Sequence, residues 1–152
     1  MLKPGTSIPA FSGLDQHGNL FDSQQLQGHP AVIYFYPKDY TPGCTAEACG
    51  FRDAYEDFIE LGAQVVGIST DSVRIHQRFA QQFQLPFTLL ADTDKKLHKK
   101  FRVGKQMFGL FNKRLTYVID AQGVILQAYD NLLGTLHIKE ALRQLKKNKH
   151  RI

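Results

Sequence analysis

The segment from Pro37 to Phe51, PKDYTPGCTAEACGF, is the part of the sequence best suited to chemistry, because it holds both cysteines of the chain. It stands where an apolar strand pattern ends and a helical pattern begins, a junction at which sites are common. If Thr41 is the N-cap, Pro42 takes the first helical position and Cys44 the third, among backbone N–H groups without a partner in the helix. These donors stabilise a thiolate, so the sequence predicts that Cys44 is a reactive nucleophile rather than a small buried hydrophobic residue.

A thiolate by itself does not make a fast catalyst. An ordinary cysteine with a pKa of about 8.5 is about 3% ionised at pH 7, so complete ionisation raises the reactive fraction only about 30-fold. That factor corresponds to about 2 kcal/mol of barrier. Rapid attack on an electrophile therefore needs groups that bind the charge developing on the leaving atom, such as the Thr41 hydroxyl, the helix N–H donors and a nearby arginine. The spacing of the residues does not identify that arginine.

Cys49 follows Cys44 by five residues, and this spacing leaves its role open. In a continuous helix the two Cα atoms lie about 8.7 Å apart, whereas a disulfide needs less than about 7 Å. Either the two cysteines never bond, or bonding unwinds the start of the helix. The low helix propensity of Gly50 makes unwinding easier. A Cys49 that stays unpaired on the core face is the simpler alternative.

Other common kinds of site do not fit the sequence. The run from Gly67 to Asp71 resembles a nucleophile elbow but has an aspartate where a glycine is needed. No glycine-rich phosphate loop or dinucleotide fingerprint occurs, and residues 92–94 lack the glycine and terminal glutamate of a calcium loop. The histidines stand at no metal-ligand spacing, and we expect them to be surface or capping residues: His17, His29, His76, His98, His137 and His150.

Length and composition indicate one globular domain spanning residues 1–152, with 43% hydrophobic and 22% charged residues. The longest apolar run, residues 31–36, is too short to cross a bilayer. The N-terminus lacks the apolar core of a secretory signal, and two cysteines do not make a disulfide scaffold. We therefore expect a protein of a reducing compartment, the cytoplasm, that makes no membrane contact.

The net charge of +5 is concentrated at the C-terminal end of the chain. From Ile138 onward six cations accompany a single anion, Glu140, whereas the rest of the chain is balanced. A basic helix end complements the helix dipole and aids solubility, and we interpret residues 146–152 as a basic C-terminal tail of this kind. Contact with nucleic acid is the alternative, but no recognition motif supports it.

Strand and helix patterns alternate along most of the chain. An N-terminal β-hairpin is expected at residues 10–14 and 18–21, buried strands at 31–36 and 64–69, a third strand at 87–91, and a second hairpin at 115–120 and 124–129. Helices are expected at residues 43–61, from a cap at 71 or 72 to the residue before Pro86, from 92 or 94 to 101, and at 136–147, with a loop around 104–109.

The second of these helices would bury Ile75, Phe79 and Phe83 along one face. The order of the elements predicts an α/β protein with a central mixed β-sheet flanked by helices and an N-terminal hairpin. Among small folds, the thioredoxin-like fold matches this order best.

The segment around the cysteines resembles the peroxiredoxins, specifically the peroxiredoxin Q or bacterioferritin comigratory protein subfamily. Pro37, Thr41 and Cys44 stand at the family spacing PxxxTxxC, and residues 41–49 meet the longer pattern TPGCTxExC in full. The resemblance extends over about residues 3–145.

The later landmarks of the family follow in the same order. They are GISTDS at residues 67–72, LPFTLLAD at 85–92, and Arg114 just before LTYVID. The resemblance implies that Arg114 is the arginine that stabilises the thiolate and the transition state. The first-turn anion Glu47 also matches the family pattern, but a favourable contact with the helix dipole explains it equally well.

The resemblance further implies a thiol-dependent peroxidase acting on hydrogen peroxide and organic hydroperoxides. Cys44 would be the peroxidatic nucleophile, shielded by Pro37, with Thr41 hydrogen-bonding the peroxide. The sulfenic acid formed on Cys44 would be resolved by Cys49 to an intramolecular disulfide, which thioredoxin or a similar dithiol would reduce. No metal, haem or flavin cofactor is implied.

A second hypothesis, from another functional class, is a redox-responsive interaction module with little turnover. In that case the disulfide between Cys44 and Cys49 would remodel the helix start and change a partner surface. Sustained consumption of peroxide distinguishes the two. We expect the protein to be a monomer, because the sequence shows no obvious exposed apolar helix.

Overall fold

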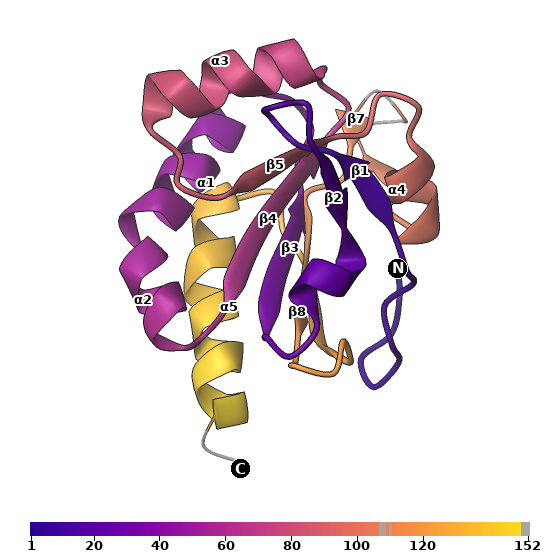
Figure 1. Cartoon of the computed structure of the whole chain (residues 1–152), viewed down its shortest axis with the longest axis vertical. Helices are drawn as coiled ribbons and strands as arrows, with labels where there is room; N and C mark the ends of the chain where they lie inside the picture. The colour runs from indigo at the N-terminus through magenta and orange to yellow at the C-terminus, as the bar shows by residue number, and fades with distance from the viewer. Residues whose placement is uncertain (107–108, 110, 150–152) are drawn as a thin grey trace.

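The computed structural model of the chain describes residues 1–106, 109 and 111–149 and shows a seven-stranded sheet with helices on both faces (Figure 1). The strand order is β2-β1-β5-β4-β3-β8-β9. The β3–β4 and β4–β5 pairs are parallel, whereas β1–β2, β1–β5, β3–β8 and β8–β9 are antiparallel, so the sheet is mixed as predicted. The bounds are β1 Ser12–Leu14, β2 Leu20–Asp22, β3 Ala31–Phe35, β4 Gln64–Ser69, β5 Thr88–Ala91, β8 Leu115–Ile119 and β9 Ile125–Asp130.

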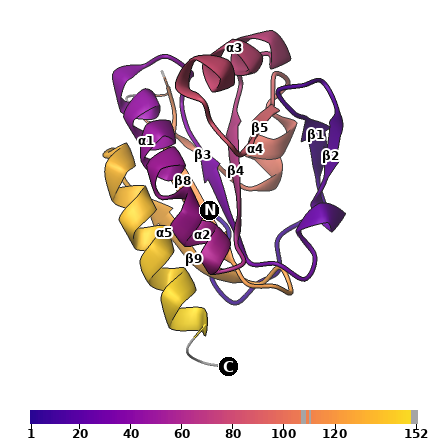
Figure 2. The same ribbon diagram turned by 60° about the vertical axis from the view of Figure 1, so that its left-hand side comes forward.

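Helices α1, α2, α3 and α5 pack on one face of the sheet, and α4 packs on the other (Figure 2). A short 3-10 helix, η1, follows β2. The bounds are η1 Ser23–Leu26, α1 Pro42–Asp53, α2 Tyr55–Glu60, α3 Val73–Phe83, α4 Lys96–Lys100 and α5 Gly134–Lys149. The sheet divides the apolar interior into two cores, one on each of its faces.

The central strand β3 contributes to both cores because successive side chains of a strand point to opposite faces. Val32 and Tyr34 enter the core beneath α1 and α5, whereas Ile33 and Phe35 enter the core beneath α4. All five residues of β3 are buried, as the continuous apolar run predicts. The strand thereby fixes the position of the loop that follows it.

The helix predicted at residues 43–61 is two helices in the structure. Ala54 leaves the helical conformation, with φ −94° and ψ 6°, and separates α1 from α2. The rings of Phe51 and Phe58, one on each side of the break, both point into the same core with centroids 5.7 Å apart. The apolar stripe in the sequence shows both rings facing inward, but it carries no Gly or Pro at residue 54 that would indicate the break.

The prediction that all six histidines are surface or capping residues is wrong for His76, His98 and His137. All three are buried, and each has a hydrogen-bonding partner for Nδ1 inside the protein. Of the apolar face predicted on α3, Phe79 is buried and Phe83 packs against the core, but His76 points inward and Ile75 is 37% exposed. A histidine can be buried when its ring nitrogens have hydrogen-bond partners. The pattern of apolar residues in the sequence does not reveal this, because it does not show those partners.

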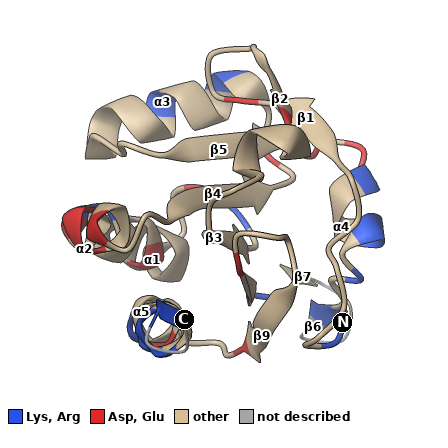
Figure 3. Ribbon diagram, turned by 60° about the horizontal axis from the view of Figure 1, so that its bottom comes forward, with Lys and Arg blue, Asp and Glu red and all other residues tan. Residues whose placement is uncertain are grey.

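The region predicted as a loop around residues 104–109 contains two short paired strands, β6 (Lys105–Gln106) and β7 (Phe111–Asn112). The last helix begins at Gly134, two residues earlier than predicted. The basic side chains Lys146, Lys147 and Lys149 lie in its last turn, and Figure 3 shows the blue Lys and Arg positions gathered along α5. The remainder of the predicted tail, residues 150–152, lies outside the described residues. Within the part of the chain described, no helix has the length and apolar character needed to span a membrane.

Candidate active site

Cys44 lies at the start of α1, in the position that the sequence predicts. Thr41 is the N-cap, with φ −70° and ψ 146°, and Pro42 opens the helix. Cys44 takes the third helical position and is only 1% exposed. Its sulfur therefore lies in the first helical turn, where backbone N–H groups without helical partners and the positive end of the helix dipole favour negative charge.

Thr41 acts as a cap through its backbone rather than through its side chain. Its carbonyl accepts the N–H of Thr45 at 2.8 Å, and its hydroxyl donates to the carbonyl of Lys38 at 2.8 Å. This turn holds the loop between β3 and α1 in a compact shape. Pro37 lies in the same loop and is half-buried.

Arg114 is the arginine beside the sulfur. Its Nη2 lies 3.4 Å from Sγ of Cys44 and its Nε donates to the carbonyl of Leu132 at 3.1 Å. The sheet brings these segments together, because Phe35 at the end of β3 pairs with Leu115 at the start of β8. Arg114, immediately before β8, therefore lies next to the loop that follows β3. The structure thus identifies the arginine that lies beside Cys44, which the spacing of the sequence alone does not identify.

Glu47 orients the guanidinium from below. Its Oε1 accepts from Nη1 of Arg114 at 2.5 Å, and the glutamate is fully buried. Burial raises the pKa of Glu47 to about 8, although the charge and hydrogen bond of Arg114 act in the opposite direction. The sequence left the role of Glu47 open, and its place three residues after Cys44 on one helix is the signal that puts both near one partner.

Two glycines leave room for this arrangement. A Cβ on Gly43 would lie 3.1 Å from Nη2 of Arg114. A Cβ on Gly134, the first residue of α5, would lie 2.7 Å from Cβ of Glu47 and 3.0 Å from the carbonyl oxygen of Gly43. Real side chains do not approach so closely, so α5 reaches the site only because residue 134 has no side chain.

His137 lies behind Glu47 but makes no ion pair with it. Its Nε2 donates to the carbonyl of Asn131 at 2.8 Å, so Nδ1 accepts from the Thr116 hydroxyl at 2.7 Å. Burial lowers the pKa of His137 to about 4, which makes the ring neutral at neutral pH. The 3.7 Å approach of Nδ1 to Oε2 of Glu47 is therefore a contact between a neutral ring and the carboxyl group.

Cys49 is half-buried and lies one and a half turns after Cys44 in the same uninterrupted helix. Both cysteines are free thiols. A disulfide between them requires α1 to unwind at its start, as the spacing predicts. The structure therefore brings Cys44 and Arg114 together and keeps Cys49 apart.

One group of metal-ligating residue types occurs among the described residues, outside the cysteine site. Asp39, Asp71 and His76 are buried with one ligand atom each within a mutual 4.8 Å. The polar atoms in this group already hydrogen-bond to one another and to neighbouring groups. The group is therefore a satisfied hydrogen-bond network rather than a vacant set of ligands.

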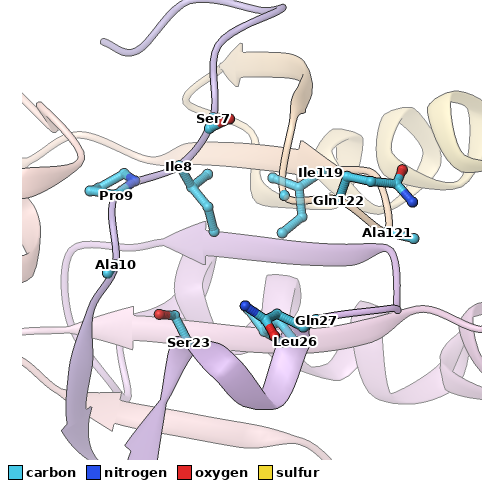
Figure 4. A pocket seen from close by; sticks show the side chains of 11 residues that line it. Ser7, Ile8, Pro9, Ala10, Ser23, Leu26, Gln27, Ile119, Ala121 and Gln122 are labelled. Atoms are coloured by element: carbon cyan, nitrogen blue, oxygen red, sulfur yellow. The ribbon is translucent and has the colours of Figure 1, made fainter.

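A cavity of about 450 Å³ lies at the far end of β8, between residues 7–10, the segment containing η1, and the turn before β9 (Figure 4). Its described lining residues carry no cysteine, histidine or charged side chain. Arg114 stands before the first residue of β8 and Ile119 is the last, so the cavity is separated from Cys44 by the length of the strand. It contributes nothing to the cysteine site.

Comparison with known proteins agrees with this geometry. The family model described as the AhpC/TSA family matches residues 4–128. The chloroplastic peroxiredoxin Q of Sedum lineare is 46% identical over 142 residues, which are 93% of this chain and 76% of that protein. The chloroplastic peroxiredoxin Q of Suaeda salsa is 44% identical over 142 residues, and these span 66% of its length.

The solved structures give the same result for the fold. The peroxidoxin BcpB from Mycobacterium tuberculosis has a TM-score of 0.89 at 35% identity, covering 97% of this chain and 98% of that one. The bacterioferritin comigratory protein of Xanthomonas campestris, whose structure concerns alkyl peroxide reduction, has a TM-score of 0.85 at 32% identity, covering 91% of each chain. The predicted thioredoxin-like fold is confirmed, and the chain belongs to the AhpC/TSA family, within its peroxiredoxin Q group.

Proposed function

We propose that this chain is a thiol-dependent peroxidase in which Cys44 attacks the peroxide and Cys49 resolves the product. The observation that carries the assignment of roles is the 3.4 Å contact between Nη2 of Arg114 and Sγ of Cys44 at the start of α1. Cys49 has no comparable cationic neighbour within hydrogen-bonding distance among the described residues. The two sulfurs therefore differ in the way that a nucleophile and a resolving thiol require.

The first step is a displacement at oxygen. The thiolate of Cys44 attacks the terminal oxygen of ROOH, the O–O bond breaks, and the sulfur becomes a sulfenic acid while RO⁻ takes up a proton and leaves as ROH. Negative charge moves from sulfur toward the departing oxygen. Arg114 and the first-turn N–H groups of α1 lie where they can stabilise both.

Thr41 takes part as a hydrogen-bond acceptor in this proposal. Its hydroxyl proton is already directed at the Lys38 carbonyl, so its oxygen offers a lone pair to the O–H of an incoming peroxide. Pro37, in the same loop, limits the access of water to the sulfur. These roles are carried over from the family motif onto the matching residues of this chain.

The second step returns the enzyme toward its resting state. The thiolate of Cys49 attacks the sulfenic sulfur of Cys44, the S–O bond breaks, a disulfide forms, and the departing hydroxide takes up a proton to become water. An external dithiol reduces this disulfide by thiol–disulfide exchange. We assign thioredoxin or a protein like it to this role, and hydrogen peroxide and organic hydroperoxides as substrates. The Xanthomonas relative named for alkyl peroxide reduction supports the organic substrates.

The proposal also includes a monomeric state and a cytoplasmic location. Gel filtration of the reduced and oxidised protein tests the first, and fractionation of cells that make the tagged protein tests the second. A dimer in either redox state would contradict the monomer proposal.

Sustained turnover is the experiment that tests the function. The protein is mixed with thioredoxin, its reductase and NADPH, and peroxide is added in large excess. We expect continuous NADPH oxidation that depends on Cys44 and ceases in Cys44→Ser. Oxidation that stops after one equivalent, despite the reducing system, would favour the redox-responsive interaction module instead.

A further inference from the structure

The loop between β3 and α1 is tied to the rest of the protein through Asp39, which is 2% exposed. Its Oδ1 accepts from the Tyr36 hydroxyl at 2.5 Å, and its backbone N–H donates to Oδ2 of Asp71 at 2.8 Å. Its Oδ2 lies 2.5 Å from Nδ1 of His76 on α3. Asp39 therefore connects the loop to the segment after β4 and to a helix more than thirty residues away in the sequence.

The positions of the protons follow from the partners. Nε2 of His76 lies 3.0 Å from the carbonyl of Leu90, which only accepts, so Nε2 carries a hydrogen. The 2.5 Å contact between Nδ1 and Oδ2 of Asp39 then requires one further proton between these two atoms. Asp71 is an acceptor in the same network, because its Oδ2 receives the Ser69 hydroxyl at 2.6 Å. The network is complete and buried, and this is the condition under which such networks rigidify a structure.

Tyr40, the residue after Asp39, shows that the loop adopts a conformation that is unfavourable in isolation. Tyr40 has φ 68°, in the left-handed region that is costly for a bulky residue. Its ring packs edge-on against Phe79 of α3, with centroids 5.1 Å apart. The contacts of Asp39 and Tyr40 with α3 thus keep the loop in place against local strain. Cys44 lies only five residues after Asp39 in the chain, so the conformation of this loop determines where the first turn of α1 lies.

We propose that Asp39 and His76 are positioning residues that hold Cys44 beside Arg114 and oppose the unwinding of α1. The inference rests on the proposed function, because it concerns the two steps of that reaction. Attack on peroxide needs Cys44 beside Arg114, whereas disulfide formation needs Cys44 to leave that place. We call the contacts of Asp39 with His76, Asp71 and Tyr36 the latch. Because the latch holds the loop before α1, it favours the first step and slows the second.

The latch predicts opposite effects on the two steps when it is removed. Asp39→Ala and His76→Ala each lower the rate of peroxide attack by about 10-fold and raise the rate of disulfide formation by about 10-fold, the scale expected when a buried hydrogen-bonding group loses its partner. Tyr36→Phe removes only one hydroxyl from the network and keeps the shape of the ring. It shifts both rates in the same directions by a smaller factor and remains a test if the alanine variants fail to fold.

A second buried pair in the protein provides the matched control. Asp92 lies 2.5 Å from Nδ1 of His98 and also accepts the N–H groups of Leu97 and His98. This pair has the same kind of contact between a carboxylate and an imidazole and is similarly buried, although Nε2 of His98 has no hydrogen-bond partner among the described residues. His98 lies on α4 and Asp92 shortly before it, on the opposite face of the sheet from α1. Asp92→Ala therefore lowers the stability of the fold without touching the loop, and both rates stay within about 2-fold of wild type.

The two rates are measured in single-turnover, rapid-quench experiments. Sulfenic acid is counted by trapping in a Cys49→Ser background, and disulfide is counted by loss of both thiols in the chain with both cysteines. The amide of Asp39→Asn can donate to Nδ1 of His76 and accept from the Tyr36 hydroxyl, so this variant is expected to restore both rates most of the way to the wild-type values. That rescue separates a positioning role from a general loss of stability.

Opposite shifts in the Asp39 and His76 variants, absent from Asp92→Ala, support the latch. Disulfide formation that is unchanged or slower in Asp39→Ala overturns it, and so do equal changes in Asp39→Ala and Asp92→Ala. If Cys49→Ser with Asp39 and His76 intact forms no sulfenic acid, the proposed function fails instead, and this result is distinct from both of the others.

Discussion

The carboxyl group of Glu47 and the guanidinium of Arg114 meet at 2.5 Å inside the protein, and the other end of the same guanidinium reaches the sulfur of Cys44 at 3.4 Å. The arginine therefore spans a buried acid and the reactive thiol. Glu47 and Cys44 share one helix, so Arg114 contacts two adjacent turns of α1 at once. Any change in Glu47 or in the space around it is expected to reach the sulfur through Arg114.

The burial of Glu47 predicts a specific dependence of stability on pH. Its pKa is raised from 4.5 to about 8, chiefly by burial, so the folded protein holds this proton more tightly than the unfolded chain does. The stability contributed by Glu47 is complete below about pH 4.5 and is lost as the pH rises toward 8, at up to about 1.4 kcal/mol per pH unit. Glu47→Gln removes this dependence.

Urea unfolding of the reduced wild type and of Glu47→Gln at pH 5, 6.5 and 8 measures this dependence of the free energy of unfolding on pH. The difference between the two proteins is the quantity to follow, because His137, with its pKa lowered to about 4, makes stability rise with pH below about 6.5 in both. We expect the variant to gain on the wild type as the pH rises. A constant difference across the three pH values would contradict the buried, protonated state of Glu47.

Removal of the guanidinium should slow the first chemical step. Arg114→Ala is expected to lower the rate of peroxide attack by about 100-fold, the usual effect of deleting one donor to a developing negative charge. Competition against a second peroxidase of known rate measures this step. Arg143→Ala, which removes an exposed arginine paired with Glu140 on α5, is the control and should leave the rate unchanged. Equal rates in the two variants would remove Arg114 from the mechanism.

The close approach of α5 predicts that a single methyl group disturbs the site. In Gly134→Ala the new Cβ would lie 2.7 Å from Cβ of Glu47 and 3.2 Å from Nη1 of Arg114, so one of them must move. We expect peroxide attack to slow by about 10-fold, a fraction of the effect of losing the donor altogether. Gly13→Ala, where the nearest atom is an ordinary 3.5 Å away on Leu97, is the control. An unimpaired Gly134→Ala would show that the guanidinium has room to shift without cost.

The separate roles of the cysteines predict different defects in their variants. Cys49→Ser should consume one equivalent of peroxide per chain at the wild-type rate and then stop, because thioredoxin has no disulfide to reduce. An added small thiol should restart turnover. Cys44→Ser should consume none. Continued thioredoxin-dependent turnover in Cys49→Ser would exclude Cys49 as the resolving residue.

Much of the fold follows from local pattern. The strand β3 is continuous, β-branched and aromatic, and its burial on both faces is visible in the sequence. The break at Ala54 and the burial of His76 were not predictable in this way. The first depends on how Phe51 and Phe58 fit a common core, and the second depends on Asp39, which lies far away in the chain. Periodicity reports which face of one element is apolar, but not which distant group satisfies a polar side chain.

The same distinction between local pattern and distant contacts applies to the residues of the site. The entrance to α1 could be predicted because Thr41, Pro42 and Cys44 act through backbone geometry that their own spacing determines. Arg114 was identified only through the family resemblance, because its approach depends on the pairing of β3 with β8. Gly134 was not singled out, since the need for a bare Cα arises only when α5 packs against α1.

The most direct test of the account is to add one equivalent of hydrogen peroxide to the reduced protein and to determine intact mass and free thiols within seconds. We predict the loss of both thiols and a mass decrease of about two hydrogens, the signature of a disulfide between Cys44 and Cys49 formed by unwinding the start of α1. Two thiols that survive as long as those of an ordinary cysteine would contradict the activation of Cys44 by Arg114 and the helix start.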